Sequence, residues 1–331
     1  MSQPRVTIIT PCYNGEAFID KYFASVLAQT YPNLELIFVN DGSVDHTERV
    51  ALSYKKALAE RGIVYKYLYQ ENGGQAKALN AGMKEMTGEY MVWPDSDDLL
   101  TPDSIEKRVR YLELHRDCAM VRSNAYVYDY ASGKPLRRIS NRENRFKTDI
   151  FLDLILEETF CCCGCYMLRV DALRTIYPDF HIYESPAGQN WQILIPMAGK
   201  YPCGYIDEDL YLVMQRPDSH SRQVRSLEQT LTRYDDLRKI LEESIALSGR
   251  QDLNYEEIVD TKYLKIFLLT YLQFNSFEGA ERCYAGLKRK GEVDGYEVSQ
   301  FLKKVHPIKY ECQRVIGRMK RITQKMITKK V

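Results

Sequence analysis

The chain has almost no net charge, no long apolar run and no sign of a leader segment. Lys and Arg number 46 against 45 Asp and Glu, so the overall charge indicates no nucleic-acid partner. The longest strongly apolar stretch, near residues 266–272, is far too short to span a bilayer. No charged segment precedes an apolar one at the start, so we expect no signal peptide. Nine cysteines in such a long chain therefore predict a reduced, cytoplasmic setting rather than a disulfide framework.

A glycine-rich loop is also missing after the first expected strand. The β-branched run at residues 6–10 is followed by Pro11-Cys12-Tyr13-Asn14-Gly15, where a dinucleotide-binding fold carries Gly-x-Gly-x-x-Gly. NAD is therefore not expected as a cofactor. The same absence argues against a nucleotidyltransferase, which would need a glycine-rich phosphate loop here. No aspartate ends the strand, which excludes an aspartyl-phosphate enzyme.

What the first hundred residues do contain is an alternation of strand and helix patterns. Strands are expected at 6–10, 34–39, 64–69 and 90–93, and helices at about 18–27, 45–61 and 75–86. The alternation predicts an α/β fold with a mostly parallel, Rossmann-like sheet and helices on both faces. Ligands of such sheets bind beyond the carboxyl ends of the strands. We therefore expect four polar loops, at 11–15, 40–43, 72–74 and 95–98, to converge on one cleft.

The rest of the chain changes character near residue 225. A helix is expected near 102–115 and a strand near 125–130, and beyond 225 helical patterns cover 227–248, 256–274 and 278–290. We predict two domains, an α/β domain over residues 1–225 and a helical C-terminal extension over 226–331.

Two carboxylates separated by one residue leave the fourth expected strand. Asp95-Ser96-Asp97-Asp98 follows the apolar stretch 90–93, and the loop after a strand frees Asp95 and Asp97 to converge. Mg²⁺ and Mn²⁺ take oxygen ligands and keep positions open for substrate phosphates. An Asp-x-Asp pair by itself is also typical of a solvated turn. We predict a metal site here because the pair belongs to one of the four loops that are expected to converge.

Taken together, the four loops resemble the family 2 glycosyltransferases of the GT-A fold. The matching residues are Thr10-Pro11-x-Tyr13-Asn14, Val39-Asn40-Asp41-Gly42-Ser43, Asn72-Gly73-Gly74 with Ala78-x-Asn80-x-Gly82, and Asp95-Ser96-Asp97-Asp98. Order and spacing match through the first hundred residues, and family-like patterns continue to about residue 225. The resemblance implies metal-dependent, inverting transfer of a sugar from a nucleotide diphosphate donor to a hydroxyl of a saccharide or lipid-linked acceptor, as in surface polysaccharide synthesis.

The resemblance also implies donor-binding residues: Pro11, Tyr13, Asn14, Asp41, Gly74, Lys77, Asp95 and Ser96. Tyr13 would cradle the base with Pro11, and Asp41 would accept from its ring N–H, which favours a UDP-sugar. Gly74 permits close backbone approach, and Lys77 would reach the diphosphate. The simpler alternatives are a core aromatic at Tyr13, a turn residue or helix cap at Asp41 and a solvated side chain at Lys77.

At the metal, Asp97 would be the protein ligand, with Asp95 nearer the donor ribose and sugar. The cofactor implied is Mn²⁺ or Mg²⁺, which neutralises charge on the leaving diphosphate. Asp98 is expected to brace the loop. His220 falls where related enzymes close a loop over the diphosphate, so it would contact metal or phosphate unless the segment is an ordinary surface loop.

The general base is where the chain departs from the family. The family places the Asp of a Glu-Asp pair at the start of a helix, and the matching position here is Asn190, which has no usable proton affinity. Glu184 is our first candidate for the base and Asp179 the second, unless the loop alignment is displaced. The alternative is a catalytically silent nucleotide-sugar-binding protein.

Two further segments lie outside these loops. The run Cys161-Cys162-Cys163-Gly164-Cys165 lacks the second pair that a zinc site needs, so we expect buried, β-structured thiols. Residues 303–331 carry ten Lys and Arg against one Glu, with apolar residues at helical spacing. Such a basic amphipathic helix suits peripheral contact with the inner face of a membrane or, alternatively, packing on the catalytic domain.

Overall fold

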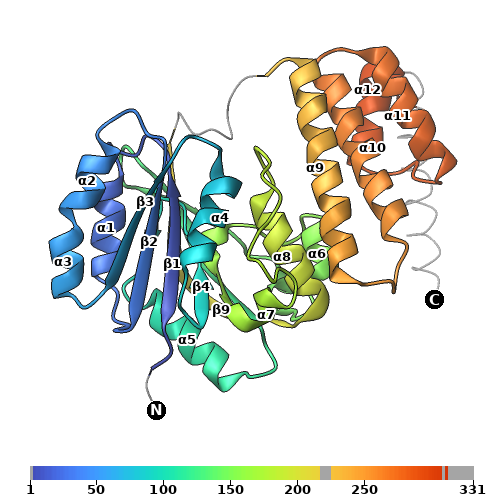
Figure 1. The fold of residues 1–331 in the computed structure, drawn as a ribbon. Helices are drawn as coiled ribbons and strands as arrows, with labels where there is room; N and C mark the ends of the chain where they lie inside the picture. The colour runs from blue at the N-terminus through green and yellow to red at the C-terminus, as the bar shows by residue number, and fades with distance from the viewer. Residues whose placement is uncertain (1–2, 217–224, 308–309, 312–331) are drawn as a thin grey trace. The chain divides into compact units, whose positions relative to one another are not determined.

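The computed structural model of the chain describes residues 3–216, 225–307, 310 and 311. The chain divides into two compact units, residues 1–223 with 240–251, and residues 224–239 with 252–331 (Figure 1). Helix α9 (Leu227–Ser248) therefore supplies its first part to the second unit and its last part to the first. That the chain has two separate domains meeting near residue 225 stays a prediction.

The first unit is built on one nine-stranded sheet of order β3-β2-β1-β4-β8-β6-β9-β5, with β7 paired to β6. The strands are β1 (Val6–Cys12), β2 (Leu34–Asp41), β3 (Val64–Gln70), β4 (Tyr90–Val92), β5 (Leu99–Leu100), β6 (Met120–Asp129), β7 (Pro135–Arg138), β8 (Tyr166–Arg169) and β9 (Cys203–Gln215). Strands β3, β2, β1 and β4 are parallel, which confirms the Rossmann-like expectation. The whole sheet is mixed, because β8 runs antiparallel between β4 and β6.

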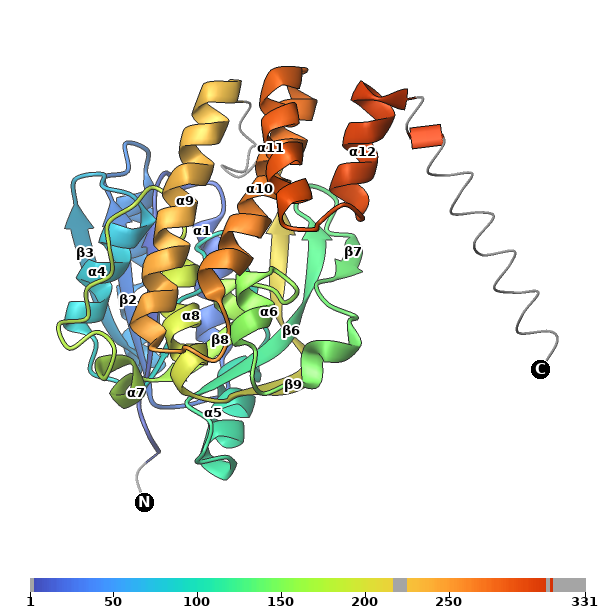
Figure 2. The same cartoon turned by 90° about the vertical axis from the view of Figure 1, so that its right-hand side faces the viewer.

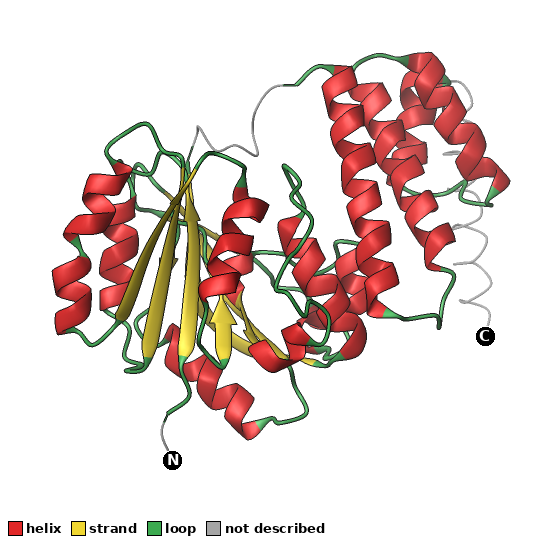
Figure 3. Cartoon of the chain, viewed as in Figure 1, coloured by secondary structure: helices red, strands yellow, loops and turns green. Residues whose placement is uncertain are grey.

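The helices of the first unit follow the expected alternation. They are α1 (Ile19–Leu27), α2 (Thr47–Ser53), α3 (Lys55–Glu60), α4 (Gln75–Glu85), α5 (Ser104–Leu114), α6 (Phe151–Ile155), α7 (Val170–Arg174) and α8 (Gln189–Lys200), with 3-10 turns η1 (Glu143–Phe146) and η2 (Cys163–Cys165). Helices α1, α2 and α3 lie on one face of the parallel strands and α4 lies on the other (Figure 3). The single helix expected over 45–61 is two helices, since the Tyr54 amide bonds to Ala51 in a tighter turn.

The core of the first unit lies along its central strands. All residues of β1, β2 and β4 are buried, as parallel strands covered on both faces require. This burial explains why the strands are continuous β-branched and apolar runs, and why the polar loops begin abruptly at their carboxyl ends.

The second unit contains the first part of α9 with α10 (Tyr255–Gln273), α11 (Phe277–Arg289) and α12 (Tyr296–Val305), visible in Figure 2. Its apolar cluster comprises Leu268, Leu272, Ala280, Cys283, Tyr284, Leu287, Val298, Phe301 and Leu302. The helices α9, α10 and α11 confirm the sequence patterns, whereas α12 was not predicted. Within the described ranges, no helix is long and apolar enough to cross a membrane. Most of the basic segment 303–331 lies outside the described residues.

One buried carboxylate on β2 connects β1, β3 and the loop before β4. Glu35 on β2 is fully buried, and its Oε2 accepts from Thr7 Oγ1 at 2.6 Å and from the Thr87 amide at 2.8 Å. Lys66 Nζ lies 3.1 Å from Oε1. Burial raises the pKa of Glu35, but these partners outweigh it, so the pKa lies below its ordinary value.

We expect Glu35→Gln to lower the free energy of unfolding by about 1–3 kcal/mol, because the amide nitrogen cannot accept the bonds that the second oxygen accepts. Because the pKa of Glu35 is lower in the folded than in the unfolded chain, the ionised carboxylate stabilises the fold at pH values above the unfolded pKa. This stabilisation is lost as the pH falls through the folded pKa. The difference from wild type should therefore shrink below about pH 4 in urea unfolding. The control is Glu85→Gln, since exposed Glu85 lies 4.0 Å from the same Lys66. An equal loss in both variants would contradict this account.

Candidate functional site

The four loops at the carboxyl ends of β1 to β4 are hydrogen-bonded in sequence, each to the next. Asn14 links the first to the second, since its amide donates to Ser43 Oγ and its Oδ1 accepts from Val44, both at 2.9 Å. Asp41 links the second to the third, and Gln75 Nε2 links the third to Asp95 Oδ1 at 2.7 Å. The expected convergence of the loops is confirmed.

The donor-side candidates differ in how accessible they are. Tyr13 is 41% exposed, so it is not a core aromatic, whereas Pro11 is buried within β1. Asn14 adopts a left-handed backbone (φ 52°), which Asn tolerates better than most residues. Lys77 is half-buried and makes no ion pair with the described residues. Its side chain runs so close to Gly73 that a Cβ there would meet Lys77 Cδ at 2.2 Å.

Asp41 is almost fully buried and its carboxylate already has three partners. Oδ1 accepts from the Gly73 amide at 3.0 Å and from Gln70 Nε2 at 2.6 Å, and Oδ2 accepts from the Gly74 amide at 2.8 Å. Gly74 has φ 86°, a conformation that glycine adopts without strain. Asp41 therefore holds the third loop in place. Its contact with a nucleotide base stays a prediction.

Three carboxylates follow β4 in quick succession, and two of them are held by fixed donors. Asp95 Oδ2 accepts from Cys163 Sγ at 3.3 Å, in addition to the Gln75 bond. Asp98 is buried and accepts from the Met214 amide at 2.7 Å, which fits its expected bracing role. Burial, with the nearby charge of Asp97, raises the pKa of Asp95 to about 6. Burial and its two acidic neighbours also raise the pKa of Asp98.

The third carboxylate, Asp97, has a side-chain cation as its partner. Its Oδ2 lies 2.9 Å from Arg216 Nη2, and the Arg216 guanidinium also lies over the Phe18 ring, 4.2 Å from its centroid. All three carboxylates line a pocket of about 330 Å³ together with Arg216. Ser96, within the tetrad, is buried, and so is Cys12 at the end of β1.

This donor set fits a divalent cation that takes part of its ligands from a substrate. In the part of the chain that the structure describes, no group of three His, Cys, Asp or Glu side chains is arranged to hold a metal by itself. Asp97 instead presents an oxygen to a pocket where a cationic group already binds, beside two carboxylates whose pKa values are raised by burial and by their acidic neighbours. Mg²⁺ is commonly held by one or two carboxylates plus substrate phosphates. His220 lies outside the described residues.

The start of α8 is attached to the same site by Asn190, which the sequence singled out, and by a pair of glutamines that it did not. Trp93 Nε1 donates to Asn190 Oδ1 at 3.0 Å, and Asn190 Nδ2 donates to the Cys161 carbonyl at 3.1 Å. Gln189 Nε2 donates to Gln75 Oε1 at 2.5 Å, so Gln75 connects α8 to Asp95. No sequence signal identifies these pairs, because the two glutamines are 114 residues apart.

Both candidate bases are exposed. Glu184 precedes α8, and its Oε1 accepts from Asn80 Nδ2 at 3.4 Å. Asn80 also exchanges two hydrogen bonds with the Ile182 backbone, at 2.8 and 2.9 Å, which holds the segment before Glu184 against α4. Asp179 is exposed, and its side chain makes no hydrogen bond or ion pair with the described residues. Neither role is tested by this geometry.

The cysteine run is not β-structured as expected. Cys163–Cys165 form the 3-10 turn η2, and β8 begins only at Tyr166. The Cys165 amide donates to the Cys162 carbonyl at 3.0 Å, which closes the turn, and Gly164 packs so tightly on Tyr211 that a Cβ would meet the ring at 2.0 Å. The eight cysteines within the described residues are free thiols.

Comparison with known proteins relates this geometry to one family. The sequence profile of glycosyl transferase family 2 matches residues 7–177, more than half of the chain. An uncharacterized glycosyltransferase of Rickettsia typhi is 48% identical over 109 residues, 33% of this chain and 32% of that protein, so the match spans about a third of the relative's length.

Two Bacillus subtilis proteins match over longer segments. One named as a glycosyltransferase, EpsE, is 27% identical over 72% of this chain and 84% of its own length. Another, named as a teichuronic acid biosynthesis glycosyltransferase, TuaG, is 31% identical over 52% of this chain and 64% of its own length.

Solved structures share the fold at low sequence identity. S. aureus TarS 1-349, in complex with UDP-GlcNAc, has a TM-score of 0.57 and 19% identity over 91% of this chain and 79% of that one. The mannosyltransferase PcManGT of Pyrobaculum calidifontis, in complex with GDP-Man and Mn²⁺, has a TM-score of 0.55 and 16% identity over 95% and 84%. These likenesses confirm the expected GT-A fold. With the profile match over more than half of its length, the chain belongs to glycosyl transferase family 2.

Proposed function

We propose that this chain is a metal-dependent, inverting glycosyltransferase. It moves a sugar from a nucleotide diphosphate donor, a UDP-sugar by preference, to a hydroxyl of a saccharide or lipid-linked saccharide in surface polysaccharide synthesis. The observation that carries the proposal is the series of hydrogen bonds that gathers four loops around the carboxylates after β4. The names of related proteins support the substrate class, since TarS was solved with UDP-GlcNAc and TuaG is named for teichuronic acid biosynthesis.

The donor would enter over the first three loops. The exposed ring of Tyr13 offers a flat surface for the base, and the Lys77 ammonium has no other ion-pair partner among the described residues to compete with a diphosphate. Asp41 keeps the Gly73 and Gly74 amides in place, and the one remaining lone pair, on Oδ2, would accept from a uracil N–H.

Asp97 would hold Mn²⁺ or Mg²⁺, with Arg216 released toward the phosphates. Bound metal supplies Lewis-acid neutralisation of the leaving diphosphate. Asp95, fixed by Gln75 and Cys163, would orient the donor ribose and sugar. PcManGT, which shares the fold, was solved with Mn²⁺, and this supports the choice of metal.

The acceptor hydroxyl needs a proton acceptor, and Glu184 is our choice. Both ends of the Asn190 amide are occupied by Trp93 and Cys161, so Asn190 acts as a positioning residue for the start of α8. Glu184 is exposed, is held by one long hydrogen bond, and precedes the same helix. It can therefore move toward an acceptor that enters beside α8.

We also propose that the protein works at the cytoplasmic face of a membrane, reached through the basic segment 303–331. The segment's ten cationic side chains would be attracted to anionic lipids. A lipid-linked acceptor would make such peripheral contact useful.

The carboxylates after β4 should make the metal-free protein less stable as the pH rises. The pKa of Asp95 is higher in the folded than in the unfolded chain, so the protonated carboxyl group favours the fold at pH values below the unfolded pKa. This contribution is lost as the pH rises through the folded pKa, which is about 6 for Asp95. The loss should reach up to about 3 kcal/mol. Urea unfolding from about pH 4 to pH 8 should show it in EDTA, and Mn²⁺ should reduce it.

Asp97→Asn should lower the pKa of Asp95 and reduce this loss, because one neighbouring charge is removed. Asp117→Asn, at an exposed site elsewhere in the first unit, is the control. An identical pH dependence with EDTA and Mn²⁺ would count against a metal at these carboxylates.

Release of nucleoside diphosphate from a panel of sugar nucleotides should require Mn²⁺ or Mg²⁺ and should be fastest with a UDP-sugar. Asp97→Asn should slow it by about a hundredfold or more, since it removes charge stabilisation at the leaving group. Glu184→Gln should slow transfer by a similar factor while donor affinity is unchanged, and Asp179→Asn should have no effect. Tight donor binding without release or transfer, even with lipid extracts as acceptors, would establish the silent-binder alternative instead.

Asn190→Asp should not increase turnover. The new carboxylate would keep the Trp93 bond but would face the Cys161 carbonyl oxygen without a proton to donate, which should cost about 1–3 kcal/mol of stability. Thermal unfolding and donor-release rates measure both effects. A rate increase with unchanged stability would show that position 190 can serve as the base.

A further inference from the structure

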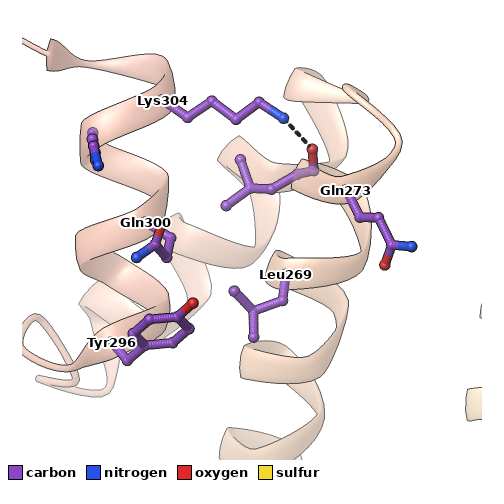
Figure 4. Close-up of a pocket in the computed structure, with 7 residues that line it drawn as sticks. Leu269, Gln273, Tyr296, Gln300 and Lys304 are labelled. Atoms are coloured by element: carbon purple, nitrogen blue, oxygen red, sulfur yellow. Dashed lines mark hydrogen bonds between the residues drawn. The ribbon is translucent and has the colours of Figure 1, made fainter.

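A second pocket lies wholly within the helical unit, between α10 and α12, and shares no residue with the candidate site. Its volume is about 490 Å³, larger than that of the carboxylate-lined pocket. Figure 4 shows Tyr296, Gln300 and Lys304 projecting from α12 on the side that faces Leu269 of α10. The pocket is therefore a groove between two helices with a mixed lining.

The groove is lined by an aromatic ring, an amide and an apolar side chain. Tyr296 is 66% exposed, so one face of its ring is available to a ligand, and Gln300 one turn later offers an amide donor and an acceptor. Leu269 supplies an apolar surface opposite. An exposed aromatic ring next to an amide suits a sugar, whose C–H face packs on rings while its hydroxyls need hydrogen-bond partners.

The charge of the groove is of one sign. Lys303 and Lys304 line its end, and no carboxylate among the described residues lines it. Lys304 Nζ donates to the Leu272 carbonyl at 2.6 Å, whereas Lys303 is exposed and makes no ion pair in the described part of the chain. The groove thus favours an anionic ligand.

We propose that this groove binds an acidic saccharide, a sugar chain that carries carboxylate or phosphate groups. A sugar ring packs on Tyr296, Gln300 binds its hydroxyls, and Lys303 pairs with the acidic group. The inference rests on the proposed function, since a transferase that extends a charged polymer gains residence time by holding the part already built.

The test is titration calorimetry of the full-length protein with a galacturonic acid tetramer, a neutral galactose tetramer and a glutamate tetrapeptide. The acidic sugar should bind in a salt-dependent way, and the other two should bind at least about tenfold more weakly. Tyr296→Ala and Lys303→Gln should each weaken binding about three- to tenfold. Lys288→Gln removes the same charge from an exposed site on α11 and should leave binding unchanged.

The outcomes separate this inference from the proposed transferase activity. Tyr296→Ala should retain wild-type metal-dependent donor hydrolysis, which needs no acceptor, and its far-ultraviolet circular dichroism should be unchanged. Equal affinity for the neutral tetramer or the peptide, or affinity that survives both groove variants, overturns the acidic-saccharide site. If the wild-type protein binds the acidic sugar but does not hydrolyse any donor, only the transferase proposal is overturned.

Discussion

The crowding of three carboxylates at the end of β4, Asp98 buried and Asp95 and Asp97 half-buried, is the constraint on which the candidate site depends. Negative charges this close together in a poorly hydrated pocket raise one another's pKa values and need donors or cations. Fixed donors satisfy Asp95 and Asp98, and Asp97 alone is left to a long, movable side chain, Arg216. Under the proposed function, a cation that arrives with a substrate would replace that guanidinium at Asp97.

The same constraint explains why the loops are joined in sequence. Asp41 holds Gly73 and Gly74, and the helix that starts immediately afterwards places Gln75 against Asp95. Gln75 in turn accepts from Gln189 at the start of α8. If donor binding shifted Asp95, the start of α8 would shift with it, because the Asp95–Gln75 and Gln75–Gln189 hydrogen bonds connect them. The half of the site that would bind the donor and the half that would admit the acceptor are thus connected by one side chain.

Patterns in the sequence predicted the parallel half of the sheet because its strands are buried on both faces and their loops obey one rule of α/β topology. The other half depends on pairings that no local pattern reveals, such as β4 with β8, whose partners Tyr90 and Arg169 are 79 residues apart. Contacts such as Gln75 with Gln189 are equally hidden. The close packing of Gly164 on the ring of Tyr211, 47 residues further along the chain, is hidden in the same way. The sequence shows which loops carry short polar residues, but it does not show which residues those side chains contact.

Asn190 shows how charge limits what this site can contain. The residue lies beside Trp93, two positions before Asp95, and its neighbour Gln189 bonds to the amide that holds Asp95. A fourth carboxylate there would add like charge to a cluster in which the pKa of Asp95 is already raised to about 6. An amide keeps the hydrogen bond to Trp93 and adds one to Cys161 without adding charge. The electrostatics of the tetrad thus favour a neutral residue at this position, and under the proposed function proton acceptance would fall to a carboxylate outside the cluster, such as the exposed Glu184.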